Sequence, residues 1–319
     1  MPKAKIFIDG EHGTTGLQIR ERLEPRADLE FIRLGDAERK DKSARAEALN
    51  AADIAILCLP DDAAREAVSL VKNPRTRIID SSSAHRTARG WVYGFPEMAE
   101  EQSELIARAP RVTNPGCYAV SAIALLRPLV RNRLIPMDYP ITINAVSGYS
   151  GGGKALIAAF EDPNSKDYTR ANFRLYNMGI VQKHIDEIQM FGLLDRRPLF
   201  TPSVGRYAQG MLLQIPLQLW TIKNKPTLSA LHTALADHYK GRKFVEVAPL
   251  EEAHAIGVAS SLDPRNLEPE ALNGTNKMRL YVFGNEKHEQ AVLVALLDNL
   301  GKGASGQAVQ CLDLMIGAS

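Results

Sequence analysis

Short apolar runs alternate with amphipathic segments over the first third of the chain. The run Asp53–Leu59 is apolar at almost every position, as in a strand buried on both faces of a sheet. Strands alternating with helices at this spacing predict a Rossmann-like α/β domain with a doubly wound parallel sheet. The expected strands are residues 5–9, 29–34, 53–59 and 77–80, and the expected helices are 17–23, 62–71 and part of the charged stretch 36–49.

The hydrophobic pattern changes after residue 116. Long strand-like runs are now separated by helices, which predicts an α+β domain with a mixed or largely antiparallel sheet. We therefore expect one domain at residues 1–116 and a second at 117–288. The expected strands are 141–146, 211–220, 244–247 and 277–284, and the expected helices are 120–130, 228–239 and two over 289–317.

Composition places the chain among ordinary globular proteins. Its 319 residues are 45% hydrophobic and 24% charged, with a formal net charge of +2. We expect neither nucleic acid nor a membrane as a partner, because the charge is small and no apolar run has transmembrane length. The N-terminus lacks the apolar core of a signal peptide. Three cysteines without CxxC spacing indicate neither a disulfide framework nor a metal site, so we expect a cytoplasmic protein.

A glycine loop follows the first strand. Gly10, Gly13 and Gly16 recur every three residues, and Thr14 and Thr15 lie between the last two. Such a backbone can turn sharply and approach a pyrophosphate, which binds the N–H groups of the next helix. The spacing differs from GxGxxG, and the alternative is an ordinary glycine-rich turn. Its place at the first strand–helix junction favours a dinucleotide site.

The residues after the second strand leave the choice of cofactor open. Asp36 is placed to accept a hydrogen bond from a ribose 2′-hydroxyl, which favours NAD. Arg33, Arg39 and Lys40 lie nearby and favour the 2′-phosphate of NADP instead. The sequence alone is evenly balanced between the two.

A single cysteine follows a tight turn and opens an apolar helix. Pro115 and Gly116 interrupt the chain directly before Cys117, and the run 120–130 is rich in Ala, Leu and Ile. A helix N-terminus favours a thiolate, which is the nucleophilic form of cysteine. The alternative is a small core residue, which is how we interpret Cys58 and Cys311.

A second glycine-rich loop, Gly148–Lys154, nearly matches a P-loop. Ala155 follows the lysine, where phosphate and Mg²⁺ binding requires a Ser or Thr hydroxyl. A nucleotidase would also leave the first glycine loop and Cys117 without a role. We therefore interpret Gly148–Lys154 as a loop that lines a small-molecule site.

Six motifs in order along nearly the whole chain resemble the shorter type of the N-acetyl-γ-glutamyl-phosphate reductase family. This family belongs to the semialdehyde dehydrogenase superfamily, which has a two-domain plan with the cysteine at the junction. The motifs are Gly10–Gly16, Asp80–Arg86, Tyr93–Glu97, Asn114–Tyr118, Ser147–Lys154, and Asp298–Leu300 with Lys302–Ala308.

The resemblance implies an NADPH-dependent oxidoreductase of arginine biosynthesis. It would reduce N-acetyl-L-glutamyl 5-phosphate to N-acetyl-L-glutamate 5-semialdehyde and release inorganic phosphate. The chemistry of Cys117 agrees, because a thioester accepts hydride better than an acyl phosphate does. The family also implies a homodimer or homotetramer, and C-terminal helices within 289–319 that complete the NADP-binding domain.

A histidine suits the proton transfer that releases the aldehyde. His184 lies in a segment similar to the family's histidine-containing segment, which opens a helix. Members of the longer type carry two histidines there, and the first of those positions is Gln182 in this chain. The alternative for His184 is a surface or capping residue.

The resemblance also assigns binding residues. Arg86 resembles the arginine that holds the leaving phosphate, and a guanidinium binds phosphate oxygens in bidentate fashion. Further substrate contacts are implied for Ser147, Gly148 and Lys154, and further cofactor contacts for Ser82, Asn299 and Gly303.

Two other functions compete with the reductase. An aspartate-semialdehyde dehydrogenase would share the mechanism, but the context Asn-Pro-Gly-Cys-Tyr around Cys117 favours the acetylglutamyl family. A non-catalytic dinucleotide sensor would need neither Cys117 nor His184, and both are present. The reactivity of the Cys117 thiol separates an enzyme from a sensor.

Overall fold

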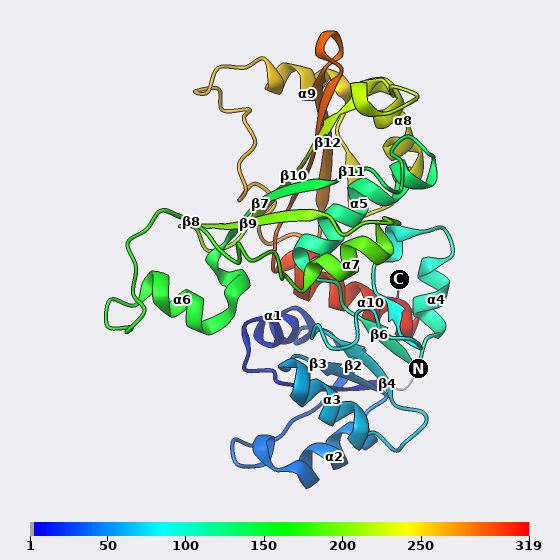
Figure 1. The fold of residues 1–319 in the computed structure, drawn as a ribbon. Coiled ribbons are helices and arrows are strands. Elements are labelled where there is room, and N and C mark those ends of the chain that lie inside the picture. The colour runs from blue at the N-terminus through cyan, green and yellow to red at the C-terminus, as the bar shows by residue number, and fades with distance from the viewer. Residues whose placement is uncertain (1–2, 319) are drawn as a thin grey trace. The chain divides into compact units, whose positions relative to one another are not determined.

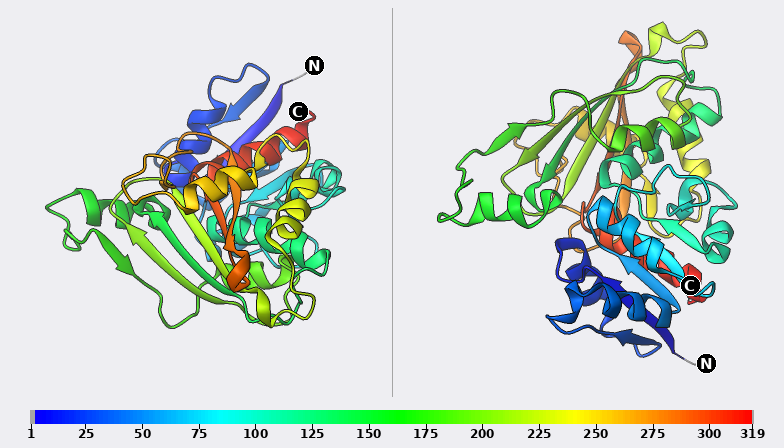
Figure 2. Two further views of the ribbon diagram at one scale, coloured as in Figure 1. Left: turned by 90° about the horizontal axis from the view of Figure 1, so that it is seen from above. Right: turned by 60° about the horizontal axis from the view of Figure 1, so that its bottom comes forward.

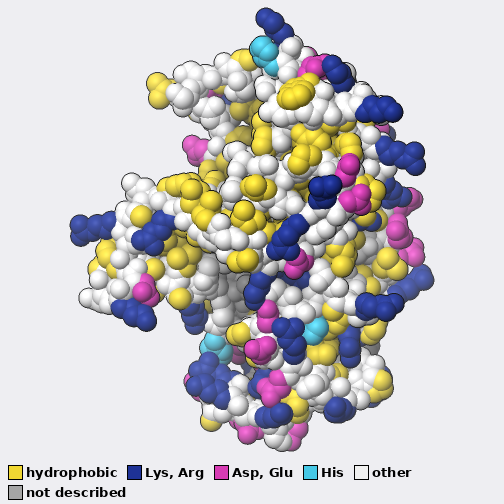
Figure 3. Space-filling view, viewed as in Figure 1, with side chains coloured by type: hydrophobic (Ala, Val, Ile, Leu, Met, Phe, Trp, Pro, Cys, Tyr) yellow, Lys and Arg dark blue, Asp and Glu magenta, His cyan; other side chains and the backbone are white. Residues whose placement is uncertain are grey.

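The computed structural model describes residues 3–318 (Figures 1 and 2). The chain clusters into two compact units, one of residues up to Gly116 together with those from Ala304 on, and one of Cys117–Gly303. Among the described residues, no helix is long and apolar enough to span a membrane. Acidic and basic side chains are interspersed over the face of the molecule in Figure 3.

The first unit contains a six-stranded sheet in the order β2-β1-β3-β4-β6-β5, and every neighbouring pair is parallel. This confirms the α/β prediction for the N-terminal region. Parallel strands place all their carboxyl ends at one edge of the sheet, where the connecting loops bind ligands. The strands are β1 (Ala4–Asp9), β2 (Leu29–Ile32), β3 (Ile54–Leu57), β4 (Arg77–Asp80), β5 (Val92–Tyr93) and β6 (Arg111–Thr113).

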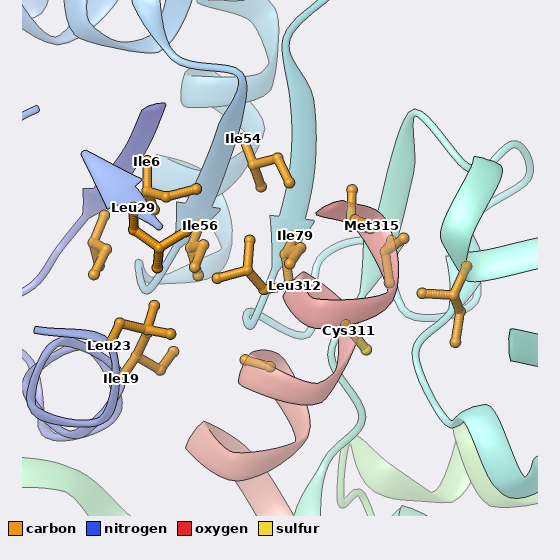
Figure 4. Packing of buried hydrophobic residues seen from close by; sticks show 14 of the residues in the cluster. Ile6, Ile19, Leu23, Leu29, Ile54, Ile56, Ile79, Cys311, Leu312 and Met315 are labelled. Carbon is orange, nitrogen blue, oxygen red and sulfur yellow. The ribbon is translucent and has the colours of Figure 1, made fainter. Parts of the chain in front are cut away.

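Helices cover both faces of this sheet. On one face, Ile6, Ile56 and Ile79 pack against Ile19 of α1 and Leu312 of α10 (Figure 4). The other face buries a second cluster that includes Leu49 of α2 and Ala67 of α3. Thus the last helix of the chain completes the first unit. The helices are α1 (Thr14–Leu23), α2 (Lys42–Ala51), α3 (Asp61–Leu70), α4 (Gln102–Arg108) and α10 (Gly306–Ile316), with 3₁₀ turns at Glu38–Lys40 and Pro96–Met98.

The second unit contains a seven-stranded mixed sheet in the order β11-β12-β13-β10-β7-β9-β8. The pairs β11–β12 and β7–β9 are parallel, and the other four are antiparallel. The predicted mixed sheet of an α+β domain is therefore confirmed. The strands are β7 (Thr142–Gly148), β8 (Phe173–Leu175), β9 (Leu199–Gly205), β10 (Met211–Gln218), β11 (Val245–Val247), β12 (Met278–Asn285) and β13 (Gln290–Leu297).

A buried helix, α5, organises this sheet and begins at Cys117. It packs against β10 and β13, with α7 and α8 beside it. The Tyr239 hydroxyl at the end of α8 donates to the carbonyl of Ala124 in α5 at 2.8 Å. The helices are α5 (Cys117–Arg131), α6 (Gly153–Glu161), α7 (His184–Phe191), α8 (Leu228–Tyr239) and α9 (Leu250–Gly257), with 3₁₀ turns at Tyr149–Gly152, Leu219–Thr221 and Glu286–His288 and a π turn at Gly301–Ser305.

One predicted helix was wrong. The first of the two helices expected over 289–317 is instead strand β13, which pairs with β10 and β12 over its full length. Its sequence, Gln290–Leu297, is a continuous apolar run, and such a run does not distinguish a buried strand from a buried helix. Long-range pairing decides between them. Strand β9 was not predicted because its sequence contains Pro202, and a proline usually argues against a strand.

Candidate active site

The glycine loop of the first unit is tightly folded over the sheet. Gly10 has φ +89°, and a Cβ there would lie 2.4 Å from the carbonyl oxygen of Cys58. A Cβ on Gly16 would lie 2.4 Å from the carbonyl oxygen of Gly10. The Gly13 amide donates to that same carbonyl at 3.0 Å, and α1 begins at the next residue. The loop therefore needs glycine at Gly10 and Gly16, and it leads directly into a helix N-terminus.

A pocket of about 420 Å³ opens beside this loop. Its wall includes Gly10–Gly13, Ile32 at the end of β2, Leu34 just after it, and Cys58–Pro60 after β3. The Thr14 hydroxyl is buried and has no hydrogen-bond partner among residues 3–318. A glycine cradle, a helix N-terminus and an unsatisfied hydroxyl at one place fit the phosphates of a dinucleotide.

Basic side chains line one side of this pocket. Arg39 and Lys40 lie on its wall, whereas Asp36 lies outside it and is highly exposed, with a carboxylate oxygen 3.2 Å from Nε of Arg39. Deeper in the pocket, Arg45 forms a buried ion pair of 2.8 Å with Asp9. The structure thus favours a 2′-phosphate over a bare ribose hydroxyl, which the sequence left open.

Cys58 lies at this pocket wall, just after β3, and not inside the strand as expected. Burial of the thiol, together with the negative charges of Asp80 and Asp9, raises the pKa of Cys58 to about 12. The thiol is therefore protonated at neutral pH and is a poor nucleophile.

The loop after β4 is held by a buried carboxylate. Asp80 is fully buried and accepts hydrogen bonds from the amide and the hydroxyl of Ser82, at 2.9 and 2.8 Å. Its Oδ2 lies 2.6 Å from Nδ1 of His85. In the same loop the Arg86 guanidinium donates to the carbonyl of Ser81 at 3.2 Å. The Ser82 hydroxyl is thus engaged inside the loop that carries Arg86.

In the second unit, Cys117 is the first residue of α5. The Ser121 hydroxyl donates to its carbonyl at 2.8 Å, inside the first helical turn. Gly303 lies directly against Cys117, because a Cβ on Gly303 would be 2.7 Å from the Cβ of Cys117. The two residues lie far apart in the sequence, and both were predicted to belong to the site.

An aromatic cluster forms around Tyr118, the residue that follows Cys117. The ring of Tyr118 meets that of His184 edge to face, with centroids 5.3 Å apart. The hydroxyls of Tyr118 and Tyr176 lie 3.1 Å apart. Burial raises the pKa of both tyrosines, that of Tyr176 to about 12, and a negative charge on Cys117 raises both further. Both hydroxyls therefore stay protonated, and the Tyr118 hydroxyl donates to the Ser203 carbonyl at 3.3 Å.

Tyr118 and Tyr176 were missed as site residues. Tyr118 follows Cys117 directly, but its side chain gives no functional signal in the sequence. Tyr176 follows β8 within a stretch that has no clear period. Only the packing of α5 against α7 and β9 brings these rings together.

The loop after β7 forms a third group. Ser147 is buried, and a Cβ on Gly148 would lie 2.4 Å from the Ala208 carbonyl oxygen. Asn299 connects this loop to the end of β13. Its amide nitrogen donates to the Ser150 hydroxyl at 3.1 Å, and its oxygen accepts from the Gly210 amide at 2.8 Å. Lys154, by contrast, is exposed near the start of α6.

The predicted site residues thus fall into groups within each unit. The second unit places Gly303 against Cys117 and His184 against the neighbouring Tyr118, and it gathers Ser147, Gly148 and Asn299 around the loop after β7. The glycine loop, Ser82 and Arg86 belong to the first unit. The part of the chain that the structure describes contains no group of three or more His, Cys, Asp or Glu that could hold a metal ion.

Comparison with known proteins defines the class. Two family models match, "Semialdehyde dehydrogenase, NAD binding domain" over residues 33–106 and "Semialdehyde dehydrogenase, dimerisation domain" over residues 117–299. Aspartate semialdehyde dehydrogenase II of Vibrio cholerae, solved with ASA, superposes with a TM-score of 0.69 at 14% identity, covering 99% of both chains. The aspartate semialdehyde dehydrogenase of Francisella tularensis superposes with a TM-score of 0.71 at 12% identity. The match covers 98% of this chain and 100% of that one. The fold is that of the semialdehyde dehydrogenases.

Sequence similarity identifies the family within this class. The N-acetyl-gamma-glutamyl-phosphate reductases of Brucella ovis and Brucella canis are each 57% identical to the chain over 316 residues, covering 99% of both sequences. At this identity and coverage, the chain belongs to the N-acetyl-gamma-glutamyl-phosphate reductase family.

Proposed function

We propose that this enzyme reduces N-acetyl-L-glutamyl 5-phosphate to N-acetyl-L-glutamate 5-semialdehyde and phosphate, as a step of arginine biosynthesis, and that Cys117 carries the acyl group as a thioester. The observation that carries the proposal is the position of Cys117. It opens a long buried helix, with Gly303 against it and His184 in the cluster of its neighbour Tyr118.

Cys117 acts as the nucleophile in this proposal. Its sulfur forms a bond to the acyl carbon of the substrate, the bond from that carbon to the phosphate oxygen breaks, and inorganic phosphate leaves. A helix N-terminus stabilises the negative charge of the attacking thiolate. Gly303 has no side chain to crowd the sulfur, so the acyl group can reach it. The resulting thioester divides one difficult reduction into two easier steps.

His184 moves the proton that accompanies reduction. Once the acyl carbon is reduced, the intermediate is a thiohemiacetal on Cys117. His184 takes the proton of its hydroxyl, the carbon–sulfur bond breaks, and the aldehyde leaves while the thiolate is restored. The Tyr118 ring packs edge to face against His184, and the Tyr118 hydroxyl is hydrogen-bonded to Tyr176 and to the Ser203 carbonyl, so this cluster helps to hold His184 in place.

The first unit supplies the cofactor site of this reaction. NADPH, when bound, supplies the hydride that reduces the acyl carbon. The glycine loop Gly10–Gly16, with Thr14 and Thr15 at the start of α1, is the proposed contact for its pyrophosphate. Arg39 and Lys40 are the proposed contacts for its 2′-phosphate, because both line the pocket beside that loop.

Arg86 is the proposed ligand of the leaving phosphate. Its guanidinium is anchored to the Ser81 carbonyl, and the loop that carries it is fixed by the buried Asp80. A guanidinium held in one orientation binds phosphate better than a mobile one, because less side-chain entropy is lost on binding. Ser147, Gly148 and Lys154 remain proposed substrate contacts, and Ser82, Asn299 and Gly303 proposed cofactor contacts.

We test the function by the reverse reaction. N-acetylglutamate semialdehyde and phosphate are mixed with NADP⁺ or NAD⁺, and cofactor reduction is followed by absorbance; aspartate semialdehyde serves as the competing substrate. We expect phosphate-dependent reduction of NADP⁺ with the acetylated substrate alone. The variant Cys117→Ser should bind NADPH normally but lose turnover. Activity within tenfold of the wild type would exclude the thioester, and activity with aspartate semialdehyde alone would reassign the substrate.

We also infer that the enzyme is a homodimer or homotetramer. Residues 117–299 match a dimerisation domain, and β8 and the segment that follows it expose large apolar side chains. Hydrophobic side chains gather over β8 and β9 in Figure 3. Apolar patches of this kind mark interaction surfaces. The exposed residues of this segment are Phe173, Leu175, Tyr176, Met178, Ile180 and Val181.

A cytoplasmic location is consistent with the cysteines. Cys58, Cys117 and Cys311, all among the described residues, form no disulfide. A nucleophilic cysteine must stay reduced to work, and the cytoplasm keeps thiols reduced.

A further inference from the structure

The second unit holds a pocket of about 330 Å³ that shares no lining residue with the proposed active site. It lies where α8 ends at Tyr239 and where β11 runs along the edge of the mixed sheet. Its volume is at the lower end of the range for small-molecule sites, which is roughly 300–1,000 Å³. The pocket is therefore large enough for a small metabolite.

The wall of this pocket is strongly positive. Its cationic residues are Lys240, Arg242, Lys243, Lys277 and Arg279. Glu246 is the acidic residue on the wall, and it lies 3.3 Å from the Arg279 guanidinium, which also contacts Glu252 at 2.7 Å. Five positive residues and one negative residue give the wall a formal charge of +4. Like charges gathered in one cavity repel each other, so a bound anion would relieve their repulsion.

An aromatic ring positions two of the nearby cations. The ammonium nitrogen of Lys243 lies 5.2 Å from the centroid of the Phe244 ring, and that of Lys302 lies 5.5 Å from it. Lys302 is fully buried, whereas Lys243 is exposed at the pocket. The negative face of an aromatic ring attracts ammonium groups. Phe244 therefore keeps Lys243 at the pocket wall, although this long side chain would otherwise extend into solvent.

The remaining lining determines the size and the chemistry of the ligand. Ala236, Leu272 and Met278 contribute small apolar surfaces, and β11 is an edge strand, which presents main-chain groups without a neighbouring strand. Lysines bind anions as mobile point charges, and three of them lie on this wall. We propose that this pocket binds a small polyanion, a compact molecule with two or more phosphate or carboxylate groups.

The test is calorimetric titration of the full-length enzyme at low ionic strength, with pyrophosphate and citrate as probes. The variant Lys240→Ala/Lys243→Ala removes two cations from the wall. The variant Lys166→Ala/Lys223→Ala removes two exposed cations outside the pocket and serves as the matched control. We expect the first variant to bind the probe at least about tenfold more weakly and the control to bind like the wild type. Affinity should also fall as salt is added.

The outcomes separate specific binding from diffuse attraction. Absence of binding to the wild type, equal weakening in both variants, or wild-type affinity in the pocket variant would each overturn the proposal. Binding of pyrophosphate alone identifies a phosphate site, and binding of citrate alone identifies a polycarboxylate site. The inference does not rest on the proposed reaction, so the Cys117→Ser protein should bind the probe like the wild type.

Discussion

At the scale of single residues, the three cysteine side chains differ in burial and in electrostatic environment. Cys311 is fully buried in α10, Cys58 lies at the wall of the dinucleotide pocket, and Cys117 opens α5. The raised pKa of Cys58, about 12, keeps its thiol protonated up to strongly alkaline pH. A helix N-terminus has the opposite effect on a thiol, because it stabilises negative charge.

We therefore expect iodoacetamide to modify Cys117 selectively in the native enzyme between pH 7 and 9. Cys58 and Cys311 should react only after unfolding in denaturant, since one is protonated and the other is inaccessible. Peptide mass spectrometry measures the extent at each site, and the Cys117→Ser protein is the control. Alkylation of Cys58 at a rate similar to that of Cys117 would contradict this assignment.

His184 is the residue to which the proposed proton transfer is assigned. Replacing it with Asn should reduce kcat by roughly 10²–10⁴-fold, the usual contribution of a general acid–base. Binding of NADPH should be unchanged, because His184 belongs to the second unit and the glycine loop to the first. His288→Asn, a change at an exposed position, is the control for histidine removal. A kcat within a fewfold of the wild type would move the role to another group.

At the scale of elements, the important feature is the π turn that follows β13. Gly301–Ser305 brings Gly303 against the first residue of α5 although almost two hundred residues separate them. Lys302, in the same turn, is buried over Phe244, and the Gly303 amide donates to the Asp298 carbonyl at 3.0 Å. The turn is thus held at Lys302 and at Gly303 itself, so this position has little freedom to move.

We expect Gly303→Ala to disturb Cys117 in particular. The new methyl group would lie 2.7 Å from the Cβ of Cys117, and overpacking of this kind typically costs about 1–3 kcal/mol. Thermal unfolding should show the loss of stability, and alkylation of Cys117 should slow as well. Gly35→Ala is the control, since a Cβ there meets only a Glu38 side chain at 3.4 Å. Unchanged alkylation and unchanged stability would show that the turn adapts.

At the scale of the whole molecule, strand β8 is an edge of the mixed sheet that exposes apolar side chains. Phe173 and Leu175 on β8 are both more than half exposed, at 55% and 57%. A row of exposed apolar residues on an edge strand favours association unless another chain covers it. A second copy of the chain is the partner that the dimerisation domain implies.

The variant Phe173→Ser/Leu175→Ser should lower the oligomeric state. Light scattering coupled to size exclusion should give a multiple of the 35.1 kDa chain mass for the wild type and a smaller mass for the variant. Leu262→Ser is the control, because Leu262 is 91% exposed but lies in another segment. Equal masses for all three proteins would place the interface elsewhere, and circular dichroism confirms that the variants remain folded.

The sequence by itself determined the order of the first four strands and the helices between them, the class of each sheet and the family, but it did not find β5, α4 and β6. These features depend on hydrophobic periodicity, on glycine spacing and on short motifs, all of which are local properties of the sequence. It also selected Cys117, Gly303 and His184; in the structure Gly303 lies against Cys117, and His184 lies against Tyr118, the next residue. It did not find Tyr118 and Tyr176, since nothing local marks a tyrosine that will pack beside a thiol.

Only the tertiary structure decided the features that depend on distant neighbours. The apolar run Gln290–Leu297 is a strand because β10 and β12 pair with it on both sides. Asp36 and Arg39 are equivalent candidates in the sequence, but only Arg39 lines the pocket. Burial disfavours the charged form of the Cys58 thiol, whereas Cys117 is the first residue of a helix. Pairing, exposure and local electrostatics are properties of the folded chain, and local sequence patterns do not encode them.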